Sequence, residues 1–278
     1  MRSYRMLERA SLAERGSERL VERRRTRRRR LGIVFVILLL LLLAAVVYGL
    51  WQSSVRIARV DVYGADASLA AYAKDAIQGS YFGIIPRDSI FFFPASHIRT
   101  DILAAHLDIA AVSIFRSSLT SISMKMSERA PIARWCGLAP TAGVDEYCYV
   151  FDASGFIFAA ATTSIQAINT FALYAPLEGE TLEPLRATIA HTERLPAAFD
   201  FARQLDTLGS PVLQVSMRGD EVDDTLKSGT RVTYVLGNER NAFTALVSAR
   251  DNLNLADGSI DYVDLRFDGK VYLKKRPK

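Results

Sequence analysis

The 278-residue sequence is poor in the side chains that build metal sites and nucleophilic catalytic centres. It contains three histidines and two cysteines. A zinc site or a Ser-His-Asp triad needs a histidine beside other ligands or a nucleophile. His97, His106 and His191 stand apart from one another, and His97 and His106 lack the i, i+4 spacing of helical metal ligands. We therefore predict no catalytic residue and no metal site, so that the chain is not expected to be an enzyme.

Phosphate-binding loops and nucleophile elbows are missing as well. The sequence has no glycine-rich phosphate loop and no Gly-x-Ser-x-Gly segment, so neither a cofactor nor a small-molecule substrate is expected. Four acidic residues cluster late in the chain but lack the spacing of a calcium-binding loop. We expect a solvated hairpin at this cluster, which consists of Asp220, Glu221, Asp223 and Asp224.

Charge is absent from residues 31–51, LGIVFVILLLLLLAAVVYGLW. An α-helix of this length matches the roughly 30 Å hydrocarbon core of a bilayer, in which the backbone must satisfy its own hydrogen bonds. Tyr48 and Trp51 lie near its end, where interfacial aromatic side chains are found. A cleaved signal peptide would have a shorter apolar core followed by a small-x-small site, which the sequence lacks. We therefore predict an uncleaved transmembrane signal anchor.

Positive charge is concentrated before this segment. Residues 1–30 hold twelve Arg and four Glu, a net +8, which leaves −3 for the rest of a chain at +5. The positive-inside rule places the N-terminus in the cytoplasm and residues 52–278 outside it, on a single-pass protein of the cell membrane. We expect the Arg-rich tail to contact anionic lipid. The exported part shows no basic stripe, so a nucleic-acid partner is not expected.

The two cysteines, Cys136 and Cys148, both lie in the exported part. An oxidising compartment permits a disulfide between them, and two buried free thiols remain the alternative. Both flank predicted strands that follow each other in the chain. We predict that they face each other across neighbouring strands and can be bonded.

Residues 55–127 have the pattern of a small β-α-α-β-β unit. A β-branched strand at 55–63 precedes a helix that carries Leu69, Ala73 and Ile77, with Asp66 or Ser68 as its cap. An aromatic loop at 81–94, with residues 91–93 packed inward, leads to a second helix. Strands follow at 111–116 and 119–127, the latter with strict alternation. The pattern predicts a three-stranded sheet covered on one face by two helices.

Residues 128–275 are mostly β. Asp152 and Gly155 mark a type I turn, Pro196 and Asn238 each begin a helix, and Asp268-Gly269 is a hairpin signal. Residues 159–195 show few periodic signals, and 276–278 form a short tail. The fold class is therefore α+β, with a mostly antiparallel β domain and flanking helices. Its strands are expected at 132–136, 147–151, 156–158, 171–174, 212–217, 221–226, 231–236, 260–267 and 270–274.

The order of these segments after a signal anchor resembles the FtsQ/DivIB family of bacterial cell-division proteins. The resemblance is carried by residues 112–116 and 119–126, by Glu128, Pro131 and Ala133, and by an Asp-Leu-Arg segment before the last strand. It implies a polypeptide-transport-associated (POTRA) domain at 55–127 and a β domain at 128–275. It also implies a non-catalytic scaffold that links membrane and extracytoplasmic division proteins at the septum. The alternatives are a membrane-anchored surface enzyme and a POTRA-type translocation component.

The resemblance also implies a partner site at the end of the β domain. In the family, small coiled-coil division proteins of the FtsB and FtsL types dock there. A C-terminal strand is expected at a sheet edge, where unpaired backbone groups can accept a partner strand. We therefore predict that Tyr272→Pro removes partner binding. The implied site consists of Val271, Tyr272, Leu273 and Lys274, with Arg266 and Phe267 as support.

Overall fold

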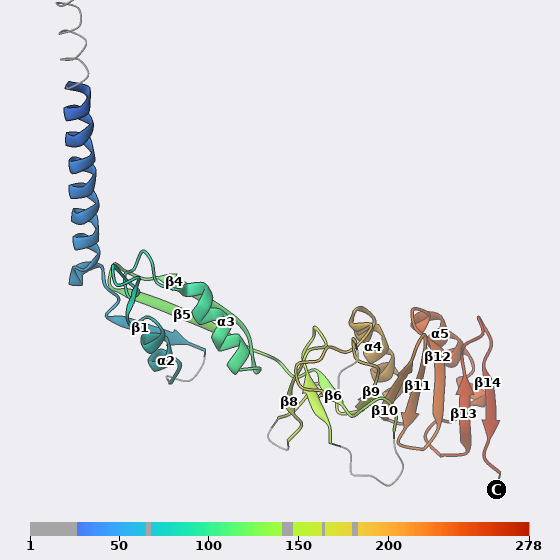
Figure 1. The fold of residues 1–278 in the computed structure, drawn as a ribbon. Helices are drawn as coiled ribbons and strands as arrows, with labels where there is room; N and C mark the ends of the chain where they lie inside the picture. Colours follow the sequence, from blue (N-terminus) through green and yellow to red (C-terminus); the bar gives the residue numbers. More distant parts are fainter. Residues whose placement is uncertain (1–26, 65–67, 141–146, 163–164, 180–182, 278) are drawn as a thin grey trace, which may run out of the picture. The chain divides into compact units, whose positions relative to one another are not determined.

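The computed structural model describes residues 27–64, 68–140, 147–162, 165–179 and 183–277 (Figure 1). The chain is mixed α+β, as its sequence predicts, and it forms two compact units. The first unit runs to Asp101 and includes Val112–Met126. The second holds Ile102–Ala111 and the chain from Ser127 onward. The short stretch Ile102–Ala111 thus groups with the second unit although it lies between parts of the first.

An apolar helix, Arg27–Leu50, begins the described chain. It is 24 residues long and, within the ranges given above, is the one helix long and apolar enough to cross a membrane. The described helix already includes residues 27–30, ahead of the predicted segment 31–51, and Arg is a good helix former. Its last turn is tightened by hydrogen bonds from Trp51 N–H to the Tyr48 carbonyl and from Gln52 N–H to the Gly49 carbonyl, each 3.2 Å.

The next elements form a three-stranded sheet with two helices. Strand β1 (Arg59–Tyr63) pairs in parallel with β5 (Ser121–Glu128), and β5 lies between β1 and β4 (Ile109–Arg116). Helices α2 (Ser68–Ala76) and α3 (Ala95–Ala105) lie between β1 and β4 in sequence. Two elements were not predicted, a 3-10 turn (Ser53–Val55) and a small hairpin of β2 (Ser80–Tyr81) and β3 (Ile85–Pro86). The proposed cap Asp66 lies outside the described residues.

The apolar residues of β5 pack inward as predicted, although Ser123 between them is buried as well, but the aromatic loop does not pack inward. Ile122 and Met124 are fully buried, whereas Phe91 and Phe92 are 52% and 49% exposed. The reason lies in the backbone before them: Ile90 N–H donates to the Val55 carbonyl at 2.9 Å. This bond draws Ile90 into the core, where it is 1% exposed, and directs the next residues outward.

The second unit is built on a nine-stranded sheet in the order β14-β13-β12-β11-β10-β9-β6-β7-β8. Five of its eight strand pairs are antiparallel and three are parallel. The strands are β6 (Ala133–Trp135), β7 (Tyr149–Phe151), β8 (Ile157–Ala160), β9 (Ala172–Tyr174), β10 (Val212–Arg218), β11 (Glu221–Leu226), β12 (Arg231–Val235), β13 (Ile260–Asp264) and β14 (Tyr272–Lys275).

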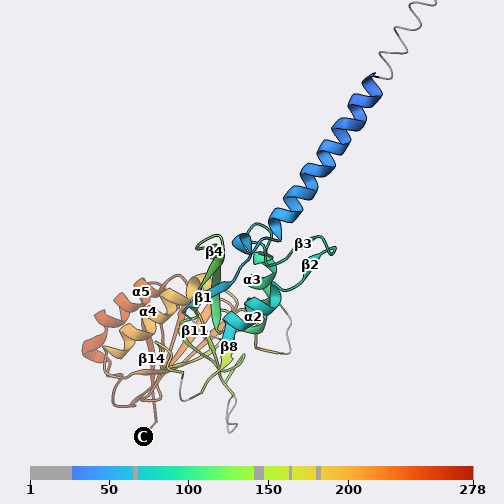
Figure 2. The ribbon, with the colours of Figure 1, turned by 90° about the vertical axis from the view of Figure 1, so that its left-hand side faces the viewer.

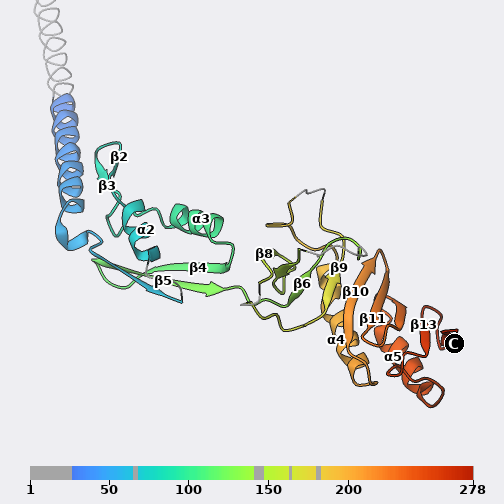
Figure 3. The same ribbon diagram turned by 90° about the horizontal axis from the view of Figure 1, so that it is seen from below.

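Helices α4 (Leu195–Asp206) and α5 (Glu239–Ser248) cover one face of this sheet (Figure 3). Pro196 lies in the first turn of α4, where its fixed φ favours a helix start. The face of α4 packs on the strands through Phe201, whose ring centroid lies 4.2 Å from that of Tyr234. Two 3-10 turns, Thr192–Arg194 and Arg250–Asn252, complete the unit. Asn238 precedes α5 as predicted, but its side chain makes no capping bond to the helix backbone.

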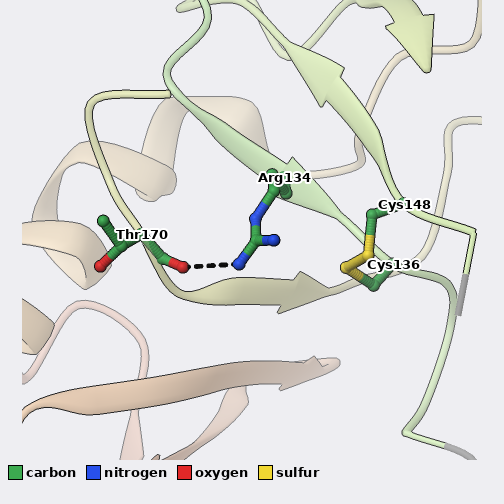
Figure 4. Close-up of a disulfide and its surroundings, with 4 residues drawn as sticks. All are labelled: Arg134, Cys136, Cys148 and Thr170. Carbon is green, nitrogen blue, oxygen red and sulfur yellow. Dashed lines mark hydrogen bonds between the residues drawn. A yellow bond between two sulfur atoms is a disulfide. The ribbon is translucent and has the colours of Figure 1, made fainter. Parts of the chain in front are cut away.

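A disulfide joins Cys136 and Cys148, with their Cα atoms 4.2 Å apart (Figure 4). Trp135 at the end of β6 pairs with Tyr149 at the start of β7, so the cysteines occupy the next opposed positions of this antiparallel pair. Beside the disulfide, Arg134 donates a hydrogen bond of 2.8 Å to the Thr170 carbonyl. The disulfide therefore closes the hairpin at the point where the ladder ends.

The acidic cluster is the expected solvated hairpin only at the β10–β11 turn, where Asp220 is exposed and Glu221 is half-buried. The expectation is wrong for the two residues further along β11. Asp223 is 7% exposed, and Asp224 is fully buried. The reason is the strand order: β11 lies inside the sheet, and Asp224 is in register with Val215 on β10 and Val232 on β12, both of which belong to the core. Asp223 accepts a 2.6 Å hydrogen bond from Thr233 and pairs with Arg218.

Candidate partner-binding edge

Strand β14 is an edge of the nine-stranded sheet. It pairs with β13 alone, in a register that sets Tyr272 opposite Asp264 and Leu273 opposite Val263. All four residues of β14 are exposed. The final strand therefore lies at a sheet edge, as predicted. It begins two residues later than expected.

The direction of the backbone groups of β14 follows from its neighbours. Arg276 N–H donates to the Ser259 carbonyl at 2.8 Å, so at this residue the backbone faces β13. Successive residues of a strand alternate in direction. The N–H groups of Lys274 and Tyr272 therefore also face β13, and those of Leu273 and Lys275 face outward. The predicted Tyr272→Pro test is thus misplaced, because the outward donor belongs to Leu273.

The other end of the sheet is covered. Arg186 N–H donates to the Ile157 carbonyl, and Ile157 N–H donates to the Ala187 carbonyl, both at 2.9 Å. These bonds pair the outer side of β8 with the chain around residues 186–189. No described residue forms such bonds with the outward groups of Leu273 and Lys275. Within the described part of the chain, β14 is thus the edge of the sheet that is open to another strand.

Exposed apolar side chains lie on both faces of the sheet at this edge, since Tyr272 and Leu273 are successive residues of β14. Phe267, Tyr272 and Leu273 are 53%, 49% and 38% exposed. The rings of Phe267 and Tyr272 form an edge-to-face pair with centroids 5.3 Å apart. Val271 instead packs against the core. The Lys274 ammonium lies 3.4 Å from Asp261, so this charge is already paired within the sheet.

Arg266 supports the edge without being free to bind a partner. Its guanidinium donates to both oxygens of Asp264, at 3.0 and 2.7 Å, and to Glu221 at 2.7 Å. These hydrogen bonds from the guanidinium, first to Asp264 and then to Glu221, raise the pKa of Arg266. The hydrogen bond from Arg266 in turn lowers the pKa of the largely buried Asp264. The cluster fixes the chain direction between β13 and the turn that leads to β14.

Sequence reasoning missed two supports of this edge. Glu221 lies 45 residues before Arg266, and Asn238 lies 30 residues before Asp268, to whose carboxylate its amide donates at 3.1 Å. Both contacts depend on strand order, because β11 and the start of α5 are brought to β13 and its turn only in the folded sheet. In the sequence, Asn238 has the ordinary pattern of a residue that begins a helix, so nothing local indicates its contact with Asp268.

No group of three His, Cys, Asp or Glu side chains that could hold a metal ion occurs among the residues with described positions. The two histidines that approach a carboxylate do so singly. His97 lies 3.4 Å from Asp101 one helical turn later, and His191 lies 3.9 Å from Glu193. The histidine is exposed in each pair, and Asp101 is half-buried.

Comparison with protein-family models and with curated proteins found no match to this chain.

Proposed function

We propose that this protein is a single-pass membrane scaffold of the bacterial division machinery, of the FtsQ/DivIB type, with no chemistry of its own. In this proposal the apolar helix anchors the chain with its N-terminus in the cytoplasm, and the exported units act at the septum. The three-stranded unit is the POTRA domain, and the nine-stranded unit is the β domain. The order β1-α2-α3-β4-β5 with sheet order β1-β5-β4 supports the first assignment.

The observation that carries the proposal is the open edge of β14. Its outward donors at Leu273 and Lys275 have no partner among the described residues, and the apolar side chains of Phe267, Tyr272 and Leu273 lie beside them. An edge strand of this kind can accept a strand from another protein, with the backbone supplying affinity and the side chains supplying specificity. The proposed occupant is an extended segment of an FtsB- or FtsL-type coiled-coil protein.

Proline scanning of β14 tests this directly. A soluble fragment of residues 52–278 is titrated with the exported segment of an FtsB-type protein, and binding is measured by calorimetry. Leu273→Pro removes an outward donor and is expected to abolish binding while circular dichroism stays unchanged. Leu273→Ala is the matched control, since it trims the same side chain but keeps the donor. It should weaken binding by about tenfold or less, on the scale of one partly buried apolar side chain.

Two results would contradict the proposal. Undiminished binding by a folded chain truncated after Gly269 would show that β14 is not the site. A fluorescent fusion of the full chain spread evenly over the membrane of dividing cells would contradict the role at the septum, whatever the binding result.

A further inference from the structure

The small hairpin β2–β3 is tied to the end of the apolar helix. The helix ends at Leu50, and the indole N–H of the next residue, Trp51, donates to the Ile84 carbonyl at 2.8 Å. Figure 2 shows the hairpin beside this end of the helix. The chain after β3 is fixed to the same junction, since Ile57 N–H donates to the Asp88 carbonyl at 2.7 Å. If the helix crosses a bilayer, the hairpin tip lies at the level of its interface.

The tip of this hairpin is apolar and faces solvent. Phe82 is 97% exposed, Ile84 55% and Trp51 45%. Removing a Phe side chain from water is favourable by roughly 1.5–3 kcal/mol. Because Phe82 is almost fully exposed, folding of the chain alone does not gain this free energy. Aromatic side chains are enriched at membrane–water interfaces, where burial of the ring among lipids would supply this free energy.

The turn itself does not favour Phe at this position. Ile84 N–H donates to the Tyr81 carbonyl at 3.0 Å, and Phe82 and Gly83 have φ of 53° and 73°. Positive φ at both central residues defines a type I′ turn, which favours Asn or Asp before Gly. A bulky residue in this conformation costs about 1 kcal/mol or more. Since folding alone would favour Asn, the large apolar side chain at 82 points to a role outside the turn.

A second exposed loop lies at the same end of the three-stranded sheet. Ala58 N–H donates to the Thr120 carbonyl at 2.8 Å, which brings the β4–β5 turn beside the chain that leaves the helix. Leu119 in this turn is 60% exposed.

Basic side chains accompany these apolar residues. Arg87 stacks over Tyr81 with its guanidinium carbon 5.1 Å from the ring centroid, and Arg116 donates to the Ile90 carbonyl at 2.7 Å. A mixture of aromatic and Arg side chains suits the headgroup region, because Arg pairs with lipid phosphate.

We propose that the β2–β3 hairpin inserts Phe82 and Ile84 into the extracytoplasmic interface of the bilayer that the helix spans. The hairpin then holds the three-stranded unit against the lipid surface and limits its rotation about the helix end. The inference rests on the membrane anchoring in the proposed function. The partner that covers the apolar tip of the hairpin is the lipid bilayer.

Tryptophan quenching by brominated phospholipids measures this contact in the full chain reconstituted into vesicles. The parent has two tryptophans, Trp51 and Trp135. Phe82→Trp adds a third at the tip, and the matched control Tyr63→Trp adds one at the other end of β1. Tyr63 is 58% exposed in the same unit, and four strand residues place it about 13 Å from Arg59. The added emission of Phe82→Trp is expected to be lost in brominated vesicles, and that of Tyr63→Trp to be retained.

The parent emission separates this inference from the proposed function. Quenching of the parent through Trp51 without loss of the added emission in Phe82→Trp overturns the hairpin insertion and leaves the anchor intact. No quenching in any of the three chains overturns the anchor and this inference together. Equal loss from the Phe82 and Tyr63 variants also overturns it, because contact would then not be specific to the hairpin.

Discussion

The buried carboxyl of Asp224 predicts how the stability of the second unit depends on pH. Both of its oxygens lack a hydrogen-bond partner among the described residues, and the residue is fully buried between Val215 and Val232. Burial, followed by the charges of Asp223 and Asp206, raises its pKa well above the usual range. Replacing it by Asn removes the titration and nearly preserves the shape.

The sign of the pH effect follows from proton linkage. Between the unfolded pKa of about 3.9 and the raised folded pKa, the folded state holds a proton that the unfolded state has lost. Stability therefore falls as pH rises through this window, by about 1.4 kcal/mol per pH unit. Asp152 and Asp264 have lowered pKa values, so they have the opposite effect on the pH dependence of stability. Burial alone would raise the pKa of Asp152, but hydrogen bonds from Ser154 and Arg129 lower it. The contributions of both residues are lost only as pH falls below about 4.

Urea unfolding of residues 52–278 measures the effect between pH 4.5 and 8. Trp51 is absent from this fragment, so the buried Trp135 alone reports on the second unit. Asp224→Asn should flatten the profile, and its stability relative to the parent should grow by about 1.4 kcal/mol per pH unit up to the folded pKa. Asp257→Asn is the control, since hydrogen bonds from Ser259 lower the pKa of that exposed carboxylate. It should change the profile only at the acid end.

Parallel profiles for the parent and Asp224→Asn across this range would refute the reasoning. They would mean that Asp224 is ionised in the folded protein and stabilised by a partner, or that its site opens to water.

Two further predictions concern the second unit. Cys136→Ser with Cys148→Ser should lower the free energy of unfolding by about 3 kcal/mol, and a reducing agent should lower that of the parent equally but leave the double variant unchanged. Gly155→Ala should destabilise the unit by about 1–3 kcal/mol more than Gly179→Ala, since a Cβ at 155 would lie 2.1 Å from Thr192 Cγ2 and one at 179 meets nothing. The two glycines have φ of 77° and 75°, so the backbone cost cancels in this comparison; equal losses would contradict the clash.

Sequence patterns correctly predicted the elements that depend on interactions between residues close in the chain. The alternation of Ile122, Met124 and Met126 identified β5, and the Asp152–Gly155 turn forms with the Gly155 N–H donating to the Asp152 carbonyl at 2.9 Å. The short strand β9, within a stretch of few periodic signals, was also found from its apolar residues. These features depend on side chains within a few residues of one another, which is the range that a single sequence exposes.

The wrong predictions of burial, for the acidic residues of β11 and for the aromatic run, have the same cause: contacts with segments distant in the sequence. Asp223 and Asp224 look like surface residues of a hairpin, and they are buried because β10 and β12 flank β11 and α4 and α5 cover one face of the sheet. The aromatic run after Ile90 looks like core, yet a backbone bond to Val55 turns it outward. In both cases the environment is set by segments that the local pattern does not contain.

The candidate edge shows where such reasoning reaches its limit. A C-terminal strand after a hairpin signal is a reasonable edge strand, and β14 is one. Which of its donors face outward depends on register alone, because a shift of one residue reverses every backbone group and every side chain. Here the pairing of β13 with β14 is irregular between Ile260 and Tyr262, and it sets Lys274 opposite Tyr262. That register makes Leu273, and not Tyr272, the residue whose donor a partner strand would meet.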